Sequence, residues 1–126
     1  MLAKEKTIAF LATTNVNLSL IFYRDLLGLE LSNEDDFALV FHLNEIELRI
    51  QKLKKLVPQP QTVLGWSVRS IEDAVGKLVS KGISFERFGG MNQNDLGIWD
   101  SPSGARIAWF KDPDGNMLSL TQHRHL

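Results

Sequence analysis

The stretch that decides the fold lies in the first quarter of the chain and reads Phe22-Tyr23-Arg24-Asp25-Leu26-Leu27-Gly28-Leu29-Glu30-Leu31. It contains the end of a predicted helix, a glycine and the start of a predicted strand. The helix begins after Asn15, whose side chain can cap it, and ends at Gly28. Residues 7–31 therefore predict the order strand, helix, strand, and residues 62–88 predict the same order again.

The helix of the second copy has clear signals at both ends. Ser70 is a good N-cap, and Glu72 and Asp73 lie in the first turn, where the helix dipole favours negative charge. Gly82 can take the left-handed conformation that ends a helix. The apolar side chains form one stripe at helical spacing, namely Ile71, Ala74, Val75, Leu78 and Val79. The first helix is apolar on more sides, so we expect it to be buried on more than one side, against another subunit.

Two strands complete the first copy. Residues 37–43 form an apolar run, and residues 46–53 alternate between apolar and polar side chains. The polar face of the alternating strand carries Glu47, Arg49 and Gln51.

The second copy predicts three further strands, at residues 83–88, 105–111 and 117–122, with a polar loop at residues 89–97. The last two strands are joined by Asp112-Pro113-Asp114-Gly115, in which proline and glycine stand where a tight turn needs them. We therefore expect these two strands to form an antiparallel pair.

Composition excludes several classes of function. The chain has 126 residues, 44% of them hydrophobic and 23% charged, with a net charge of −1, so nothing predicts binding to nucleic acid. It has no cysteine, and its apolar runs are far shorter than the roughly 20 residues that cross a bilayer. Residues 1–7 are not followed by the apolar segment of a secretion signal, so we expect a cytoplasmic chain that does not bind membranes.

The order and spacing of these elements resemble the vicinal oxygen chelate superfamily, which includes glyoxalase I, bleomycin-resistance proteins and extradiol dioxygenases. The resemblance is carried by residues 22–31, by 71–82 and by 112–116. It implies an α+β fold of two βαβββ modules that form a glyoxalase/bleomycin-resistance-type half-barrel cleft. We expect one domain over residues 1–126, with module one at about 5–56, a linker at about 57–61 and module two at about 62–126.

The same resemblance implies where a metal would be bound. Metal enzymes of the superfamily place histidine in the first strand of each module, or glutamine in the second, and glutamate in the last strand. These places correspond to Ile8, Val63 and Ser119. Alkyl groups do not bind divalent cations and a lone serine hydroxyl binds them poorly, so we expect no metal and no other cofactor.

The candidate ligand-binding residues follow from strand alternation, with Ile8, Val63 and Ser119 taken to face the cleft. Arg49 could pair with an anionic group, although a nearby Glu47 would neutralise it, and two tryptophans could stack on a planar ligand. The full set comprises Phe10, Arg49, Gln51, Ser67, Trp99, Trp109, Ser119 and Thr121.

Three functions remain open. The leading hypothesis is a homodimeric, metal-independent binder of a small, partly apolar molecule. The alternative is a lyase, isomerase or dioxygenase-type enzyme that uses unusual ligands such as Glu47 and His42, or acid–base catalysis without metal. The third is a protein-interaction module whose cleft is filled by its own side chains. His123 and His125 could bind metal adventitiously.

Overall fold

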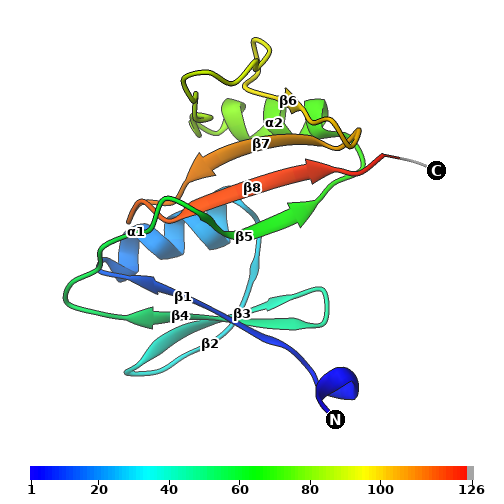
Figure 1. The fold of residues 1–126 in the computed structure, drawn as a ribbon. Helices are drawn as coiled ribbons and strands as arrows, with labels where there is room; N and C mark the ends of the chain where they lie inside the picture. The colour runs from blue at the N-terminus through cyan, green and yellow to red at the C-terminus, as the bar shows by residue number, and fades with distance from the viewer. Residues whose placement is uncertain (125–126) are drawn as a thin grey trace. The chain divides into compact units, whose positions relative to one another are not determined.

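The computed structural model describes residues 1–124, and the chain divides into two compact units, Met1–Val57 and Pro58–Leu126. Each unit contains one four-stranded mixed sheet (Figure 1). The order of elements in the first is β-α-β-β-β, and the second follows the same plan. The predicted α+β class and the duplicated βαβββ architecture are confirmed.

The N-terminal unit begins with a single 3-10 turn, η1 (Leu2–Lys4), which precedes strand β1 (Ile8–Thr13). Helix α1 (Val16–Leu20) continues as the wider π-helical turn η2 (Ile21–Leu26). The remaining strands are β2 (Glu30–Glu34), β3 (Ala38–Leu43) and β4 (Ile46–Lys52). The sheet order is β1-β4-β3-β2, with β1 parallel to β4 and the other pairs antiparallel.

Local sequence signals explain this unit. The Asn15 side chain accepts a hydrogen bond from the Leu18 amide, as an N-cap should, and Gly28 has a positive φ of 74° where the helix ends. Leu48 and Ile50 of β4 are fully buried, whereas the alternating polar residues lie on the other face. The predicted alternation of β4 is therefore confirmed.

The C-terminal unit contains β5 (Thr62–Ser67), α2 (Ile71–Ser80), β6 (Trp99–Asp100), β7 (Arg106–Lys111) and β8 (Met117–Gln122). Its sheet order is β5-β8-β7-β6, with β5 parallel to β8. Helix α2 lies along one face of this sheet (Figure 1) and buries Ile71 and Val75 completely. The Ser70 cap, the Gly82 terminus and the antiparallel β7–β8 pair are as predicted.

The predicted strand at residues 83–88 is wrong. Only Phe85 forms a bridge, to Phe110, and the Glu86 amide donates to the Trp109 carbonyl. The Gln93 side chain forms hydrogen bonds with the backbone groups that a longer strand would use. Its Oε1 accepts from the Phe88 amide and its Nε2 donates to the Glu86 carbonyl, at 2.9 and 3.0 Å. The outer edge of β7 is therefore paired by two short pieces, near Phe85 and in β6.

Candidate functional site

Five of the predicted ligand-binding residues share one face of the C-terminal sheet. The strand register places Gly65, Ser119 and Trp109 in one row across β5, β8 and β7. The neighbouring row contains Ser67, Thr121, Ile107 and Trp99. Directly paired residues point to the same side of a sheet, and rows two residues apart are separated by roughly 7 Å. The face opposite α2 therefore carries hydroxyls beside two indole rings.

Gly65 and Ser119 approach each other closely within the first row. A Cβ atom on residue 65 would lie 2.5 Å from Oγ of Ser119 and 3.2 Å from its carbonyl oxygen. Contacts below 3.0 Å are essentially never made by real Cβ atoms. Gly65 is exposed and Ser119 is 8% exposed, so the missing side chain leaves the Ser119 hydroxyl lying over bare backbone.

Aromatic rings border the hydroxyls. The ring centroids of Trp99 and Trp109 are 6.2 Å apart, and Phe88 meets Trp109 edge-on at 5.4 Å. All three side chains are half-buried. This packing holds the Trp109 ring from two sides while part of its surface stays accessible, which suits contact with an apolar or planar molecule.

Trp66 belongs to the other face of the sheet. Its register partner is Leu120, and its ring stacks on Phe110 with centroids 6.4 Å apart. Phe110 is fully buried. Trp66 can therefore serve as an internal reference for Trp99 and Trp109, which lie on the opposite face.

The other three predicted residues lie in the N-terminal unit, again on one face of a sheet. Phe10 pairs in register with Arg49, and Ala12 pairs with Gln51. Phe10 is 55% exposed and Gln51 is exposed. These side chains share a face that is accessible within this unit.

Arg49 is held between two carboxylates. Its Nη1 lies 3.5 Å from Oε2 of Glu47, and its Nη2 lies 3.5 Å from Oδ2 of Asp35. An anionic ligand would compete with both partners. Glu47 partly neutralises Arg49, as expected from the sequence, and Asp35 adds to this effect.

Asp35 is fixed mainly by the backbone. Its Oδ1 accepts hydrogen bonds from the amides of Phe37 and Ala38, at 2.8 and 2.9 Å. These two bonds, with a smaller effect from Arg49, hold the pKa of Asp35 below its ordinary value of 3.8. The carboxylate beside Arg49 is therefore ionised at neutral pH.

The three positions that correspond to metal ligands do not offer suitable donors. Ile8 and Val63 are 47% and 42% exposed, and Val63 lies at a bulge in β5, where Thr62 pairs with Met117 and Leu64 with Leu118. Within residues 1–124, no group of three or more histidine, aspartate or glutamate side chains is placed to hold a metal ion. The residues present do not fit the metal that the fold family implies.

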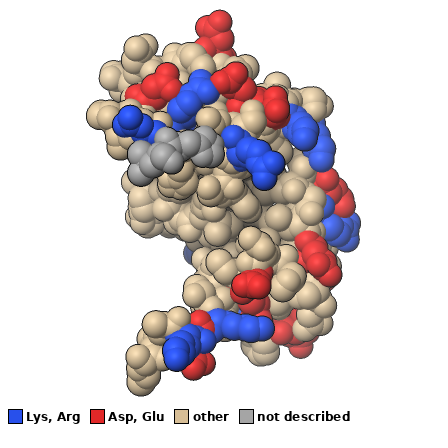
Figure 2. Space-filling view, turned by 90° about the vertical axis from the view of Figure 1, so that its right-hand side faces the viewer, with Lys and Arg blue, Asp and Glu red and all other residues tan. Residues whose placement is uncertain are grey.

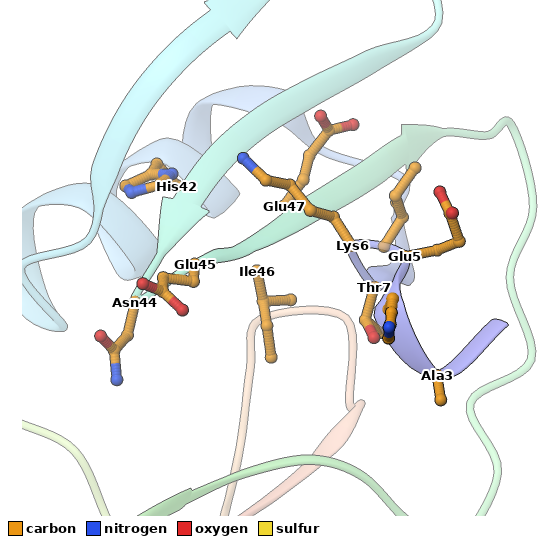
Figure 3. A pocket seen from close by; sticks show the side chains of 11 residues that line it. Ala3, Glu5, Lys6, Thr7, His42, Asn44, Glu45, Ile46 and Glu47 are labelled. Atoms are coloured by element: carbon orange, nitrogen blue, oxygen red, sulfur yellow. The ribbon is translucent and has the colours of Figure 1, made fainter.

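His42 and Glu47, the residues of the enzyme hypothesis, are brought together. They are directly paired across β3 and β4, and both line a hollow in the N-terminal unit (Figure 3). Residues 3–8 form another wall of this hollow. Apart from Ile8, sequence reasoning missed them, because nothing in their local pattern shows that they lie beside the β3–β4 hairpin. His123 is exposed at the end of β8, and His125 lies outside the described residues.

Comparison with known proteins agrees with the fold. The family model of the Glyoxalase/Bleomycin resistance protein/Dioxygenase superfamily matches residues 7–120. The chain therefore belongs to this superfamily. A comparison with curated proteins finds no match.

Solved structures extend the likeness. A glyoxalase family protein from Enterococcus faecalis is 26% identical, with a TM-score of 0.73 over 97% of this chain and 100% of that one. A superfamily member from Sphaerobacter thermophilus is 18% identical, with a TM-score of 0.73 over 98% and 100%. A lactoylglutathione lyase from Agrobacterium tumefaciens is 14% identical, with a TM-score of 0.72 over 94% and 93%. The last two show a shared fold alone.

On the face drawn in Figure 2, basic and acidic residues are interspersed and neither sign forms one large patch. No helix within residues 1–124 has both the length and the apolar character needed to cross a membrane.

Proposed function

We propose that this protein binds a small, partly apolar molecule without a metal ion, on the face of the C-terminal sheet that carries Trp99, Trp109, Ser119 and Thr121. The observation that supports this most directly is that two neighbouring rows of side chains share this face. One row has the Ser119 hydroxyl over Gly65 at its centre, and the other ends at Trp99. Indole rings offer apolar area at low entropic cost, and hydroxyls can donate or accept a hydrogen bond. Such a mixture is typical of small-molecule sites.

The donor types support a metal-independent mode of binding. Lyase and dioxygenase chemistry in this superfamily relies on a cation that polarises an oxygen atom, and such a cation needs carboxylate or imidazole ligands. Ile8 and Val63 supply neither, and Ser119 supplies one neutral hydroxyl. The proposed binding uses the apolar rings and the hydroxyls that stand on the face instead.

The experiment is a nuclear magnetic resonance titration with a panel of small planar aromatic compounds. Compounds that bind as proposed shift the indole N–H signals of Trp99 and Trp109 and leave that of Trp66 in place. Trp109→Ala abolishes these shifts, while Trp66→Phe retains them. A panel that yields no saturable shift at Trp99 or Trp109 would refute the proposal.

Metal content tests the proposal that binding is independent of a metal ion. Protein purified without an affinity tag should contain no stoichiometric Zn²⁺, Ni²⁺, Fe²⁺ or Mn²⁺, and a chelator should leave its thermal midpoint unchanged. If the His123→Ala and His125→Ala variants still contained stoichiometric metal, the binder hypothesis would fail and a Lewis-acid enzyme would be favoured.

A second candidate function is acid–base catalysis, favoured by the direct pairing of His42 and Glu47 beside one hollow. A carboxylate and an imidazole within one site can move a proton between two positions of a substrate. This candidate requires turnover of a carbonyl or thiol-adduct substrate that Glu47→Gln abolishes and Glu34→Gln does not. Absence of turnover across a broad substrate panel would count against it.

A further inference from the structure

The N-terminal unit contains a hollow that the proposed binding face does not use. Its volume is about 800 Å³, and its walls come from two segments, residues 3–8 with η1 and the β3–β4 hairpin at residues 42 and 44–47 (Figure 3). The walls carry both signs of charge, since Lys4 and Lys6 face a hollow that also contains Glu5, Glu45 and Glu47. All of these residues belong to the same unit.

The charges of the hollow are largely unpaired. Within residues 1–124, neither Lys6 nor Glu45 has an ion pair, and the Glu47 carboxylate reaches only Arg49, at 3.5 Å. Figure 3 shows the Lys6 side chain extending, in that view, from the N-terminal segment toward β4. An ammonium and a carboxylate that line one hollow without pairing are both available to a ligand.

Glu45 stands at a backbone position that favours glycine. Asn44 and Glu45 form the tip of the hairpin, with φ values of 27° and 73°. Two-residue hairpin turns with positive φ at both positions favour Asn-Gly, because a side chain at the second position strains the backbone. The chain carries a glutamate there instead, and this glutamate lines the hollow.

We propose that this hollow binds a small zwitterion, a molecule with an ammonium group and a carboxylate, between Lys6 and Glu45. A ligand of one charge would be attracted by some of these side chains and repelled by others, whereas a zwitterion can meet both an ammonium and a carboxylate. Arg49 already offsets Glu47, whereas Glu45 has no ion pair within residues 1–124, so the Glu45 carboxylate can meet the ammonium group. The residues of this site belong to a different unit from those of the aromatic face.

The test uses three probes of matched length, namely 6-aminohexanoate, hexanoate and hexylammonium, at constant ionic strength. In a titration followed by amide chemical shifts, 6-aminohexanoate should shift residues 3–8 and 42–47 and saturate, with an affinity at least about tenfold above that of either single-charge probe. Equal affinity for the three probes, or shifts confined to the region of Trp109, would overturn the proposal.

Substitutions distinguish an effect on ligand binding from an effect on the stability of the fold. Lys6→Met should weaken binding of 6-aminohexanoate at least about tenfold, whereas Lys55→Met, at an exposed residue outside the hollow, should not. Glu45→Gly should raise the unfolding midpoint and still abolish binding, because it relieves the backbone and removes the carboxylate. Unchanged binding in Glu45→Gly would overturn the assignment.

A last variant separates this proposal from the proposed function. Trp109→Ala should leave the affinity for 6-aminohexanoate unchanged while it abolishes binding of planar compounds. If Trp109→Ala abolished binding of both 6-aminohexanoate and the planar compounds, the two would share one site. That result would overturn the proposal of a separate site in the hollow.

Discussion

The Oγ atom of Ser119 lies 2.5 Å from the point that a Cβ atom on Gly65 would occupy. The two residues are register partners on neighbouring parallel strands, so neither can change size without affecting the other. The family resemblance places Ser119 where metal enzymes of the superfamily carry a glutamate in the last strand. A longer side chain at residue 119 would have to lie over the same bare backbone, so Gly65 and Ser119 together shape this part of the face.

Gly65→Ala should therefore destabilise the protein by roughly 1 to 3 kcal/mol, because the new methyl group forces Ser119 out of its position. The free energy of unfolding in urea measures the effect. Adding Ser119→Ala should restore at least half of the loss, since it removes the clashing oxygen.

Gly76→Ala is the matched control for that substitution. Gly76 lies within α2, and a Cβ atom there would meet nothing within 4 Å. It should stabilise the protein by about 0.5 to 1 kcal/mol through helix propensity. If Gly65→Ala behaved like Gly76→Ala, the close approach of Gly65 and Ser119 would be wrong.

Asp112→Ala should cost roughly 2 to 4 kcal/mol of stability, because a buried carboxylate closes the β7–β8 turn. Asp112 is 5% exposed. Its Oδ1 accepts from the amides of Asp114 and Asn116, and its Oδ2 accepts from Nδ2 of Asn116 at 2.8 Å. Asp95→Ala, in the exposed loop, should change the unfolding free energy by no more than about 0.5 kcal/mol. Equal small effects of the two changes would contradict this role.

Asp35 predicts a pH dependence of stability. Its pKa in the folded protein lies below the ordinary value of 3.8, so the folded state binds fewer protons than the unfolded state in that range. The contribution is complete above about pH 4 and is lost as the pH falls through the folded pKa. When the urea midpoint of unfolding is plotted against pH, Asp35→Asn should flatten the acid side of the curve. Asp36→Asn should leave that side of the curve unchanged. An acid limb that is identical in Asp35→Asn and the parent protein would exclude this contribution.

Dimerisation remains a prediction with a specific surface. Leu18 and Ile21, on α1 and at the start of η2, are each 48% exposed despite being large and apolar. We expect a homodimer in which this helix and the edge strands lie at the interface. Ile21→Lys should lower the affinity of dimerisation at least about tenfold, since burying such an apolar side chain is worth roughly 1.5 to 3 kcal/mol.

Size-exclusion chromatography with light scattering measures that change. Leu96→Lys, at an exposed apolar residue of the loop, serves as the control and should leave the dimer intact. A parent protein that is monomeric at micromolar concentration would remove the dimer prediction.

Local interactions made much of the fold readable from residue order. Asn15, Ser70 and Gly82 act within one helical turn, and the Asp112–Asn116 turn closes on its own side chain. Such signals depend on residues two to four positions apart, so they are visible without knowledge of the rest of the chain. The alternation in β4 and the face shared by Ser67, Ser119 and Thr121 follow from the period of two in strands.

Contacts between distant residues escaped that reasoning. Gln93 occupies the backbone of residues 86–88 and prevents a full strand, Asp35 reaches Arg49, and residues 3–8 lie beside the hairpin tip to form the hollow. Each depends on where a loop or terminus lies after the sheets have formed. Strand register and side-chain reach determine those positions, and neither is encoded in the few neighbouring residues that create a helix cap or a turn.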